Sequence, residues 1–88
     1  MKAYVLIQTQ AGQEPVAQQL RTIPGVVSAE DIRGPYDAIA LAQSGSTRDL
    51  IEEVVDEIRR LPGVTLALPA PMIRSLPEGT VRLAAGTG

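Results

Sequence analysis

The chain contains no cysteine, histidine, tryptophan or phenylalanine, and two tyrosines are its only aromatic residues. The lack of cysteine excludes disulfide bridges and thiolate metal sites. The lack of histidine excludes imidazole zinc sites and serine–histidine–aspartate triads within one chain. Two aromatic residues are too few for the stacking platforms that hold single-stranded nucleic acid. We therefore expect no metal site, no cofactor and no catalytic residue.

Positive charge is also scarce, since eight Lys and Arg residues against ten Asp and Glu give a formal net charge of −2. A surface that binds nucleic acid directly needs clustered Lys and Arg, so we expect no such partner. No apolar run approaches membrane-spanning length, and the start at Met1 lacks the pattern of a signal peptide. The composition therefore favours a cytoplasmic protein with no membrane partner. Its 88 residues are enough for one domain with a thin core.

The first third of the chain predicts a strand, a short helix and a second strand. Lys2 to Thr9 is apolar on both faces, so both faces are expected to be covered. The helix that follows ends at Pro24-Gly25. Its buried stripe, at helical spacing, is Val16, Leu20 and Ile23. Val26 to Arg33 has a charged end, which is typical of an edge strand.

The remaining elements are a hairpin partner, a longer helix and a last strand. Gly34-Pro35 is predicted to turn the chain into a strand from Tyr36 to Ala42. Ser46 and Asp49 have the spacing of a capping box that begins the second helix. The apolar stripe of that helix consists of Leu50, Ile51, Val54, Val55, Ile58 and Leu61.

The second helix is followed by a strand that contains two prolines. Pro62-Gly63 ends the helix, and a strand begins with Val64 to Leu68. Pro69 and Pro71 lack a backbone N–H, which predicts an edge strand or a bulge. We place the domain at residues 1–74 and expect a flexible tail over residues 75–88, where Pro, Gly, Thr and Ala dominate.

An internal repeat supports this order of elements. The segment from Arg21 to Val26 is echoed by Arg59 to Val64, and the buried positions of the two helices fall at the same offset. Two such β-α-β units form a ferredoxin-like fold. We therefore predict an α+β fold of the β-α-β-β-α-β sandwich type, a four-stranded antiparallel sheet with two helices on one face.

Two helices leave the opposite face of such a sheet without cover. Along the third strand, Ala38, Ala40 and Ala42 alternate with Ile39 and Leu41, so either set leaves an apolar outer face. Soluble monomers rarely expose an apolar area of this extent. Pairing of two sheets face to face would cover it, and we expect the chain to form a dimer in this way.

The turn Arg33-Gly34-Pro35-Tyr36-Asp37 is the one cluster of chemically capable residues. As a ligand site, its backbone N–H groups would hold a carboxylate, Asp37 would pair with an ammonium group, and Tyr36 would form a wall. As a plain hairpin turn, Gly and Pro would set the backbone angles and Asp37 would bond the local backbone. Tyr36 and Asp37 are also an acid and a base, but no neighbouring group tunes them for catalysis.

Four segments together resemble a known family. Lys2-Ala3-Tyr4-Val5-Leu6-Ile7, Ile23-Pro24-Gly25-Val26-Val27, Gly34-Pro35-Tyr36-Asp37 and Leu61-Pro62-Gly63-Val64 are similar to the effector-binding RAM domain of Lrp/AsnC (feast/famine) transcriptional regulators. The likeness covers roughly Met1 to Arg74. It implies a stand-alone RAM protein without a helix-turn-helix, dimeric through its sheet and often assembled further into rings such as tetramers of dimers.

The resemblance also implies where a ligand binds. Amino acids or similar effectors would bind at the contact between dimers, held by Gly34, Pro35, Tyr36 and Asp37, with Arg33 beside them. Many relatives carry hydroxyl residues early in the last strand, where they help to hold the ligand. The matching residues here are Ala67 and Pro69, which cannot donate or accept such side-chain hydrogen bonds.

Three functions remain open at this point. The favoured one is a ligand-binding and oligomerisation module that senses an amino acid or related metabolite, linked to transcriptional regulation of amino acid metabolism. The second is a ligand-independent assembly partner of full-length Lrp/AsnC regulators. The third, disfavoured by the lack of histidine and of paired carboxylates, is an enzyme of the dimeric α+β barrel type.

Overall fold

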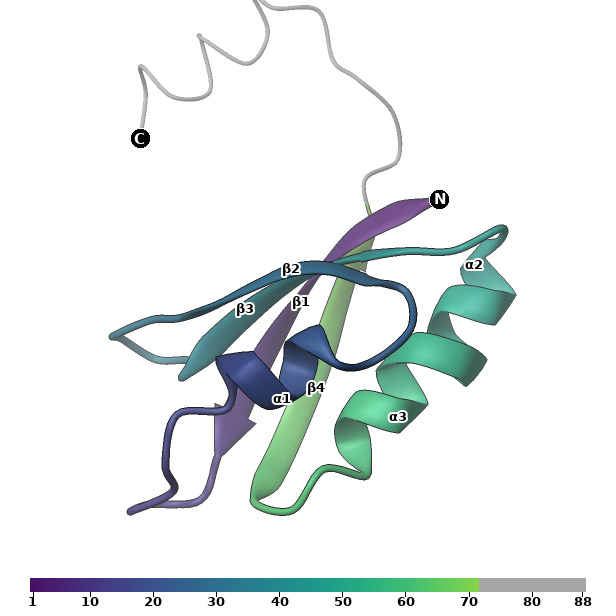
Figure 1. Cartoon of the computed structure of the whole chain (residues 1–88). Coiled ribbons are helices and arrows are strands. Elements are labelled where there is room, and N and C mark those ends of the chain that lie inside the picture. The colour runs from purple at the N-terminus through teal and green to yellow at the C-terminus, as the bar shows by residue number, and fades with distance from the viewer. Residues whose placement is uncertain (72–88) are drawn as a thin grey trace, which may run out of the picture.

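The computed structural model describes residues 1–71 and has the predicted order of elements (Figure 1). Residues 72–74 of the predicted domain, and the predicted tail, lie outside the described residues. The elements are β1 (Lys2–Thr9), α1 (Ala17–Arg21), β2 (Val26–Asp31), β3 (Ala38–Gln43), α2 (Thr47–Asp49), η1 (Leu50–Val55), α3 (Asp56–Arg59) and β4 (Val64–Pro71). Since α2, η1 and α3 follow one another without a break, we call them together the second helix.

The strands form one antiparallel sheet in the order β2-β3-β1-β4. Each outer strand follows a helix, and each inner strand precedes one, as two β-α-β units require. Both α1 and the second helix lie on the same side of this sheet (Figure 1). The α+β, ferredoxin-like fold class predicted from the sequence is therefore confirmed.

The core lies between the helices and one face of the sheet, and small residues dominate its sheet side. Eight inward-facing strand residues are at most 1% exposed: Ala3, Val5, Ile7, Ala29, Ala38, Ala40, Ala42 and Ala67. Because six of them are alanine, the helices can approach the sheet closely. The helices fill the space with Val16, Leu20, Leu50, Val54, Val55 and Ile58, all buried as predicted.

The second helix begins at its predicted cap but has an unexpected centre. Ser46 Oγ accepts a hydrogen bond from the backbone N–H of Asp49 at 3.1 Å, which confirms the cap. The residues of η1 form a π-helix, and Asp56 N–H donates to Ile51 O, five residues back. Leu50 and Val55, the first and last residues of η1, are both fully buried.

The predicted hairpin forms, but both of its strands are shorter at the turn. The sequence predicted strands up to Arg33 and from Tyr36, whereas β2 ends at Asp31 and β3 begins at Ala38. Ile32 N–H still donates to Asp37 O at 3.0 Å, and pairing stops there. Gly34 has a φ of +139°, which strands do not contain, and the following proline has no N–H to offer a ladder.

The last strand is an edge strand, as predicted, and it continues through both prolines. Val5 pairs with Pro69, and Ala3 pairs with Pro71. Alternate residues of an antiparallel edge strand point their N–H toward the free side, so a proline there loses no ladder bond. A register shift between Gln8 and Thr9 leaves Thr65 as an extra residue on β4, which therefore also contains a bulge.

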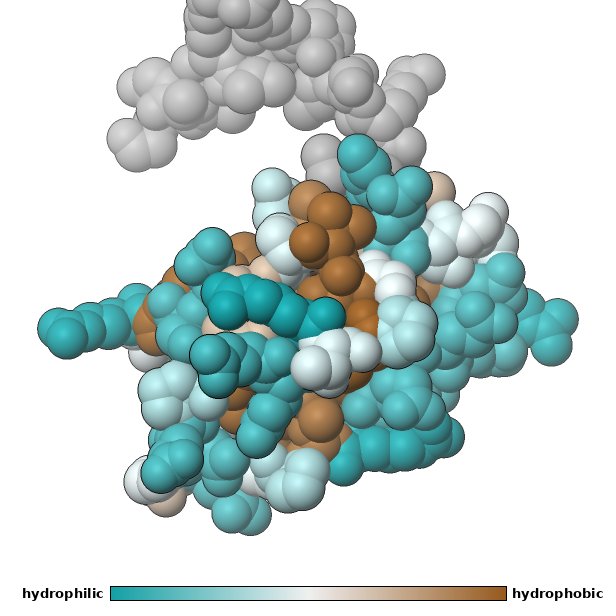
Figure 2. Space-filling model, in the orientation of Figure 1, coloured by the Kyte–Doolittle hydropathy of each residue, from teal (hydrophilic) through white to brown (hydrophobic). Residues whose placement is uncertain are grey.

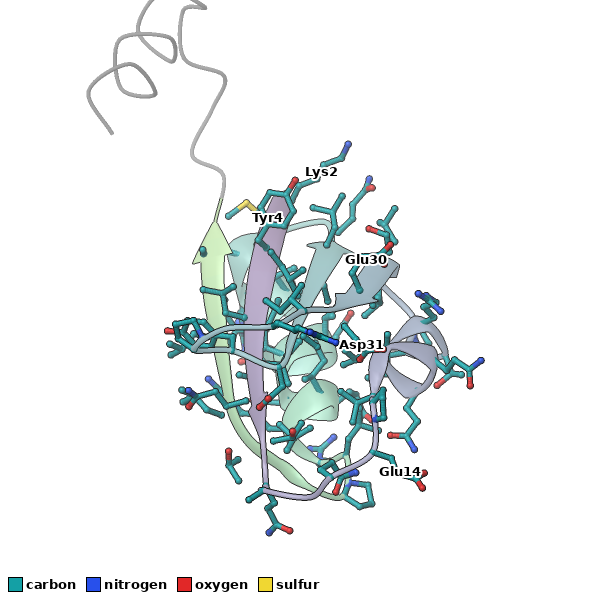
Figure 3. All side chains as sticks on the ribbon, turned by 90° about the vertical axis from the view of Figure 1, so that its left-hand side faces the viewer. Lys2, Tyr4, Glu14, Glu30 and Asp31 are labelled. Atoms are coloured by element: carbon teal, nitrogen blue, oxygen red, sulfur yellow. The ribbon has the colours of Figure 1, made fainter. Side chains whose placement is uncertain are left out.

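The face of the sheet opposite the helices carries a continuous apolar strip, which we call the open face. Its residues are Tyr4, Leu6, Ile39, Leu41, Leu66 and Leu68. Leu6 lies between Ile39 and Leu68 in the register, while Tyr4 is 45% exposed and Leu68 39%. Figure 3 shows Tyr4 on β1 and Glu30 on β2 with the second helix behind the sheet. A single chain therefore covers one face of β1, as expected for two helices on a four-stranded sheet, and cover of the other face by a second chain stays a prediction.

Hydrophilic side chains cover the outer side of the second helix (Figure 2). Three ion pairs lie there, all between exposed side chains: Arg48–Glu52, Arg59–Asp56 and Arg60–Glu57. Exposed pairs of this kind add at most about 0.5 kcal/mol each. The helix is therefore held by its buried stripe rather than by its charges.

Pro24-Gly25 and Pro62-Gly63 end the two helices as predicted, and Gly25 also permits close packing. Gly25 has a φ of +96°, and a Cβ built there would lie 2.6 Å from Val54 Cγ2. Its carbonyl accepts a hydrogen bond from Gln43 N–H at 2.7 Å. Gly25 therefore fixes how closely the turn after α1 packs on the second helix.

Replacing Gly25 with alanine is expected to destabilise the fold more than replacing Gly12. Both residues have positive φ, but the Cβ position at Gly12 has no neighbour within 4 Å. Both variants carry a backbone cost of roughly 1 kcal/mol, and only Gly25→Ala adds overpacking, of about 1–3 kcal/mol. Urea denaturation of the two variants measures the difference. Equal free energies of unfolding would contradict the close packing described here.

Candidate functional site

The loop between β2 and β3, residues 32–37, carries the predicted ligand residues on the surface. Arg33, Gly34, Pro35 and Asp37 are exposed, and Tyr36 is half-buried. The side-chain amide of Gln8 donates to Pro35 O at 2.7 Å, which ties the loop to β1. No atom lies within 4 Å of a Cβ built on Gly34, so its positive φ, rather than crowding, requires glycine.

Asp37 joins this loop to the end of β1 through both its backbone and its side chain. Its Oδ2 accepts from Thr9 N–H at 2.8 Å, and its own N–H donates to Ile7 O at 2.9 Å. The carboxylate thus bonds backbone 28 residues away, not the local backbone that a plain turn would use. Its Oδ1 accepts no hydrogen bond from residues 1–71 and remains available to a ligand.

Asp31, at the end of β2, caps the first helix from a distance. Its Oδ1 accepts from the N–H groups of Val16 and Ala17, each at 3.1 Å. Residue 16, at the N-cap position of α1, has no side chain that could accept these bonds. From the sequence alone, Asp31 is one of the charged residues, with Glu30, at the end of a predicted edge strand. No local spacing reveals this role, because the partners lie 14 and 15 residues away.

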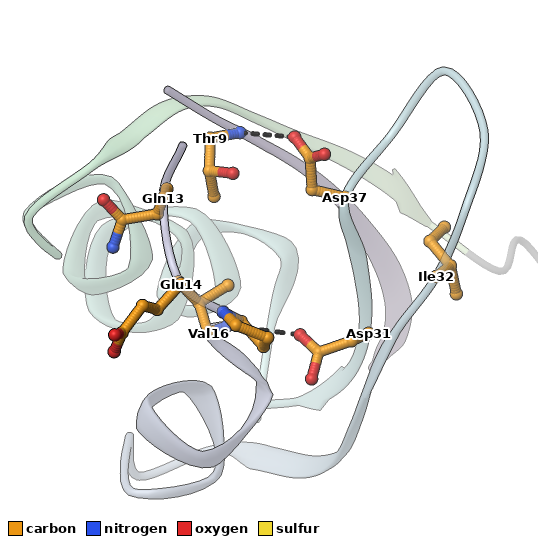
Figure 4. Close-up of a pocket in the computed structure, with 8 residues that line it drawn as sticks. Thr9, Gln13, Glu14, Val16, Asp31, Ile32 and Asp37 are labelled. Carbon is orange, nitrogen blue, oxygen red and sulfur yellow. Dashed lines mark hydrogen bonds between the residues drawn. The ribbon is translucent and has the colours of Figure 1, made fainter. Parts of the chain in front are cut away.

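Between these two carboxylates lies a hollow of about 180 Å³ (Figure 4). It is lined by Thr9, Gln13, Glu14, Pro15, Val16, Asp31, Ile32 and Asp37. Three of the described lining residues are acidic and none is basic, so the hollow suits an ammonium group better than an anion. Sites that enclose a small molecule usually measure roughly 300–1,000 Å³, so a single chain encloses only part of such a ligand.

The predicted site residues do not meet in one cavity of a single chain. Of the seven, only Asp37 lines the hollow, and Arg33 to Tyr36 continue along the loop beside it. Ala67 is fully buried against the helices, and Pro69 is half-buried two residues further along β4. Strand β1 separates both from β3. The assignment of Ala67 and Pro69 to a ligand site stays a prediction.

A second hollow, of about 560 Å³, lies at the other end of the sheet. It is lined by Pro24, Gly25, Gln43, Ser44, Gly45, Asp49, Glu53, Val54 and Glu57. None of the predicted site residues borders it. Within residues 1–71 no group of three or more acidic residues is arranged to hold a metal ion. No helix in that part of the chain is both long and apolar enough to span a membrane.

Comparison with known proteins gives one family and several similar structures. Residues 2–67 match the family model of the Lrp/AsnC ligand binding domain. The structure of TTHA0845 from Thermus thermophilus is 26% identical with a TM-score of 0.76, over 88% of this chain and 98% of that one. FFRP-DM1 is 29% identical with a TM-score of 0.72, over 82% and 97% of the two chains.

A third similar structure is the hypothetical protein PHS023 from Pyrococcus horikoshii. It is 29% identical with a TM-score of 0.68, over 88% of this chain and 92% of that one. No curated protein matches the chain.

Loss of the Asp31 carboxylate is expected to destabilise α1. Asp31→Ala leaves the N–H groups of Val16 and Ala17 without their acceptor, which costs about 1–2 kcal/mol. Asp31→Asn keeps an acceptor oxygen and is expected to cost less than half as much. Thermal or urea unfolding measures both, with Glu30→Ala as the neighbouring control. A Glu30→Ala effect as large as that of Asp31→Ala would refute the capping role.

Proposed function

Because this chain belongs to the Lrp/AsnC ligand-binding domain family, we propose that it is a regulatory module that binds an amino acid or a related small metabolite. The observation that carries the proposal is the hollow beside the β2–β3 loop. There, Asp37 presents a carboxylate oxygen with no partner among residues 1–71, next to Asp31 and Glu14. An acidic hollow of this kind fits the ammonium end of an amino acid.

The carboxylate end of the ligand requires donors, which the loop backbone offers. The loop residues Arg33, Gly34 and Tyr36 are exposed or half-buried, and within residues 1–71 their backbone N–H groups donate to no other backbone group. Since the hollow encloses only part of a small molecule, we infer that another chain completes the site. This fits binding at a contact between dimers, the arrangement that the family resemblance implies.

Packing of two chains against each other through their open faces would form the dimers. The strip from Tyr4 to Leu68 is apolar and continuous across three strands, and no other element of residues 1–71 covers it. Two such sheets packed face to face would remove it from water. The ligand loop lies at one end of the sheet, outside the strip, so a dimer leaves it accessible to a second dimer.

Regulation would follow from the shared site. A ligand held by two dimers binds the larger assembly better than the separate dimers, and therefore shifts the equilibrium toward it. Full-length Lrp/AsnC regulators are the partners to which such a change would be passed, with amino acid metabolism as the regulated process. A cytoplasmic location and the absence of catalysis stay predictions of this proposal.

One observation favours a second candidate, a ligand-independent assembly partner of such regulators. Asp37 already uses Oδ2 to hold Thr9, and neither Ala67 nor Pro69 has a polar side-chain atom for a ligand. In this case the chain would join regulators of its family through the open face. Co-purification of the tagged chain with a helix-turn-helix regulator, unaffected by added amino acids, would favour it.

Calorimetric titration with the twenty amino acids tests the first candidate. We expect at least one to bind, and Asp37→Asn to weaken that binding about ten- to a hundredfold, as loss of a charged hydrogen bond predicts. Asn retains an acceptor oxygen for Thr9 N–H, so the fold is kept while the charge is lost. Glu30→Gln, which removes a charge on β2 away from the hollow, is the control. Absence of binding by every amino acid would reject amino acid sensing by this chain.

Introduction of a charge on the open face tests the proposed dimer. Leu68→Glu would place a carboxylate in the contact between two sheets, and we expect the mass in solution to fall to that of one chain. Gln18→Glu adds the same charge on the exposed side of α1 and is expected to leave the mass unchanged. Light scattering after size-exclusion chromatography measures both variants. A wild-type mass retained in Leu68→Glu would place the contact elsewhere.

A further inference from the structure

The two outer strands present backbone groups to the free edges of the sheet, and the register identifies which residues these are. Ile7 O accepts from Asp37 N–H, so the odd-numbered residues of β1 bond toward β3. Gln10 N–H donates to Gly63 O, so even-numbered residues bond toward β4. Residues of β4 that pair with odd-numbered residues of β1 therefore point their N–H and C=O groups away from β1, toward the free edge of the sheet. Ala67, paired with Ile7, is one of them.

On the opposite edge, the backbone groups of β2 alternate in the same way between the partner strand and the free side. The bond from Ile32 N–H to Asp37 O shows that the preceding pair, Asp31 with Ala38, exchanges no hydrogen bonds. Because bonded and non-bonded pairs alternate along the strand, Ala29 and Ala40 also exchange no backbone hydrogen bonds. The backbone of Ala29 therefore points outward as well. Each edge thus has a buried alanine whose carbonyl faces the free side.

An arginine side chain donates a hydrogen bond to each of these two carbonyl oxygens. Arg21 donates to Ala29 O from Nε at 3.2 Å and from Nη2 at 2.7 Å. Arg59 donates to Ala67 O from Nη2 at 3.1 Å. Each arginine lies in the last turn of a helix and bonds the strand that follows, eight residues along the chain.

The two contacts are equivalent in the internal repeat. Arg21 and Arg59 are the first residues of the two similar segments, and Ala29 and Ala67 keep the same offset. The repeat thus relates two side-chain contacts as well as two β-α-β units. The structure places the repeated arginines at the two edges where strands of another chain would pair.

Other outward groups on these edges are also unsuited to pairing. Pro69 has no N–H, so the free side of β4 lacks one donor next to Ala67. On β2, the side chain of Asp31 is directed to the start of α1, which lies along that edge (Figure 3). Native edge strands commonly use prolines, charges and covering elements to prevent strand addition.

We propose that Arg21 and Arg59 are a matched pair of edge guards that close both sides of the sheet to strand addition from other copies of this chain. An added strand would need the carbonyls of Ala29 and Ala67 as acceptors, and a guanidinium group already holds each one. Association is then directed to the face of the sheet. The inference concerns the edges alone, so it stands whether or not the proposed ligand exists.

The test compares a double variant, Arg21→Ala with Arg59→Ala, with two controls. The first control, Arg48→Ala with Arg60→Ala, changes the net charge equally, from −2 to −4, but removes only exposed ion pairs. The second is a core variant, Val5→Ala, at a urea concentration that gives it the same free energy of unfolding as the double variant. This control separates faster assembly that is caused by lower stability from faster assembly that is caused by unprotected edges.

Assembly is followed by thioflavin T fluorescence and light scattering while circular dichroism reports folded protein. We expect the double variant to form β-rich assemblies larger than those of wild type, at least about tenfold faster than either control. A rate equal to that of either control would overturn the proposal. If the double variant does not fold, Arg59→Ala is compared with Arg60→Ala by the same measurements and with the same criterion.

Arg59→Lys provides a further check on the mechanism. Lysine keeps a charged donor that can reach Ala67 O, so it is expected to restore slow assembly at the β4 edge. Assembly of Arg59→Lys as fast as that of Arg59→Ala would show that the bond to Ala67 O is not what protects this edge.

Discussion

The structure depends on the packing of two helices against one side of a four-stranded sheet. Six alanines on that side let the helices approach closely, and Leu20 and Ile58 fill the space between the layers. Every large apolar residue of the inner strands that points the other way is left on the open face. The same arrangement that builds the core therefore creates the surface through which we propose that copies meet.

The candidate site depends on the same sheet. Two of its three carboxylates lie at the end of the hairpin and hold the backbone of another segment: Asp31 bonds two N–H groups at the start of α1, and Asp37 bonds one at the end of β1. These bonds fix the β2–β3 loop while leaving one carboxylate oxygen of Asp37 available. The hollow they border is shallow in one chain, so the proposed ligand site and the proposed assembly depend on each other.

Local sequence patterns predicted the fold well, because each element has its own signal. The stripe from Leu50 to Ile58, the Ser46 cap and the repeated Pro-Gly pairs all act within a few residues. The π-helical centre, the shortened hairpin strands and the bonds of Arg21, Asp31 and Arg59 depend on contacts formed only after folding. The loop at Gly34 was recognised as a candidate site, but the neighbouring hollow, lined from three separate segments, has no signature along the chain.

We propose that the open face is covered by a second chain, and so not exposed to water, in the working protein. Sedimentation equilibrium of the wild-type chain over a range of concentrations measures whether it is. We expect the mass of a dimer, or of a multiple of dimers, down to the lowest concentration at which the protein is folded. A folded single chain throughout the range, with Tyr4 accessible to a soluble quencher, would contradict it.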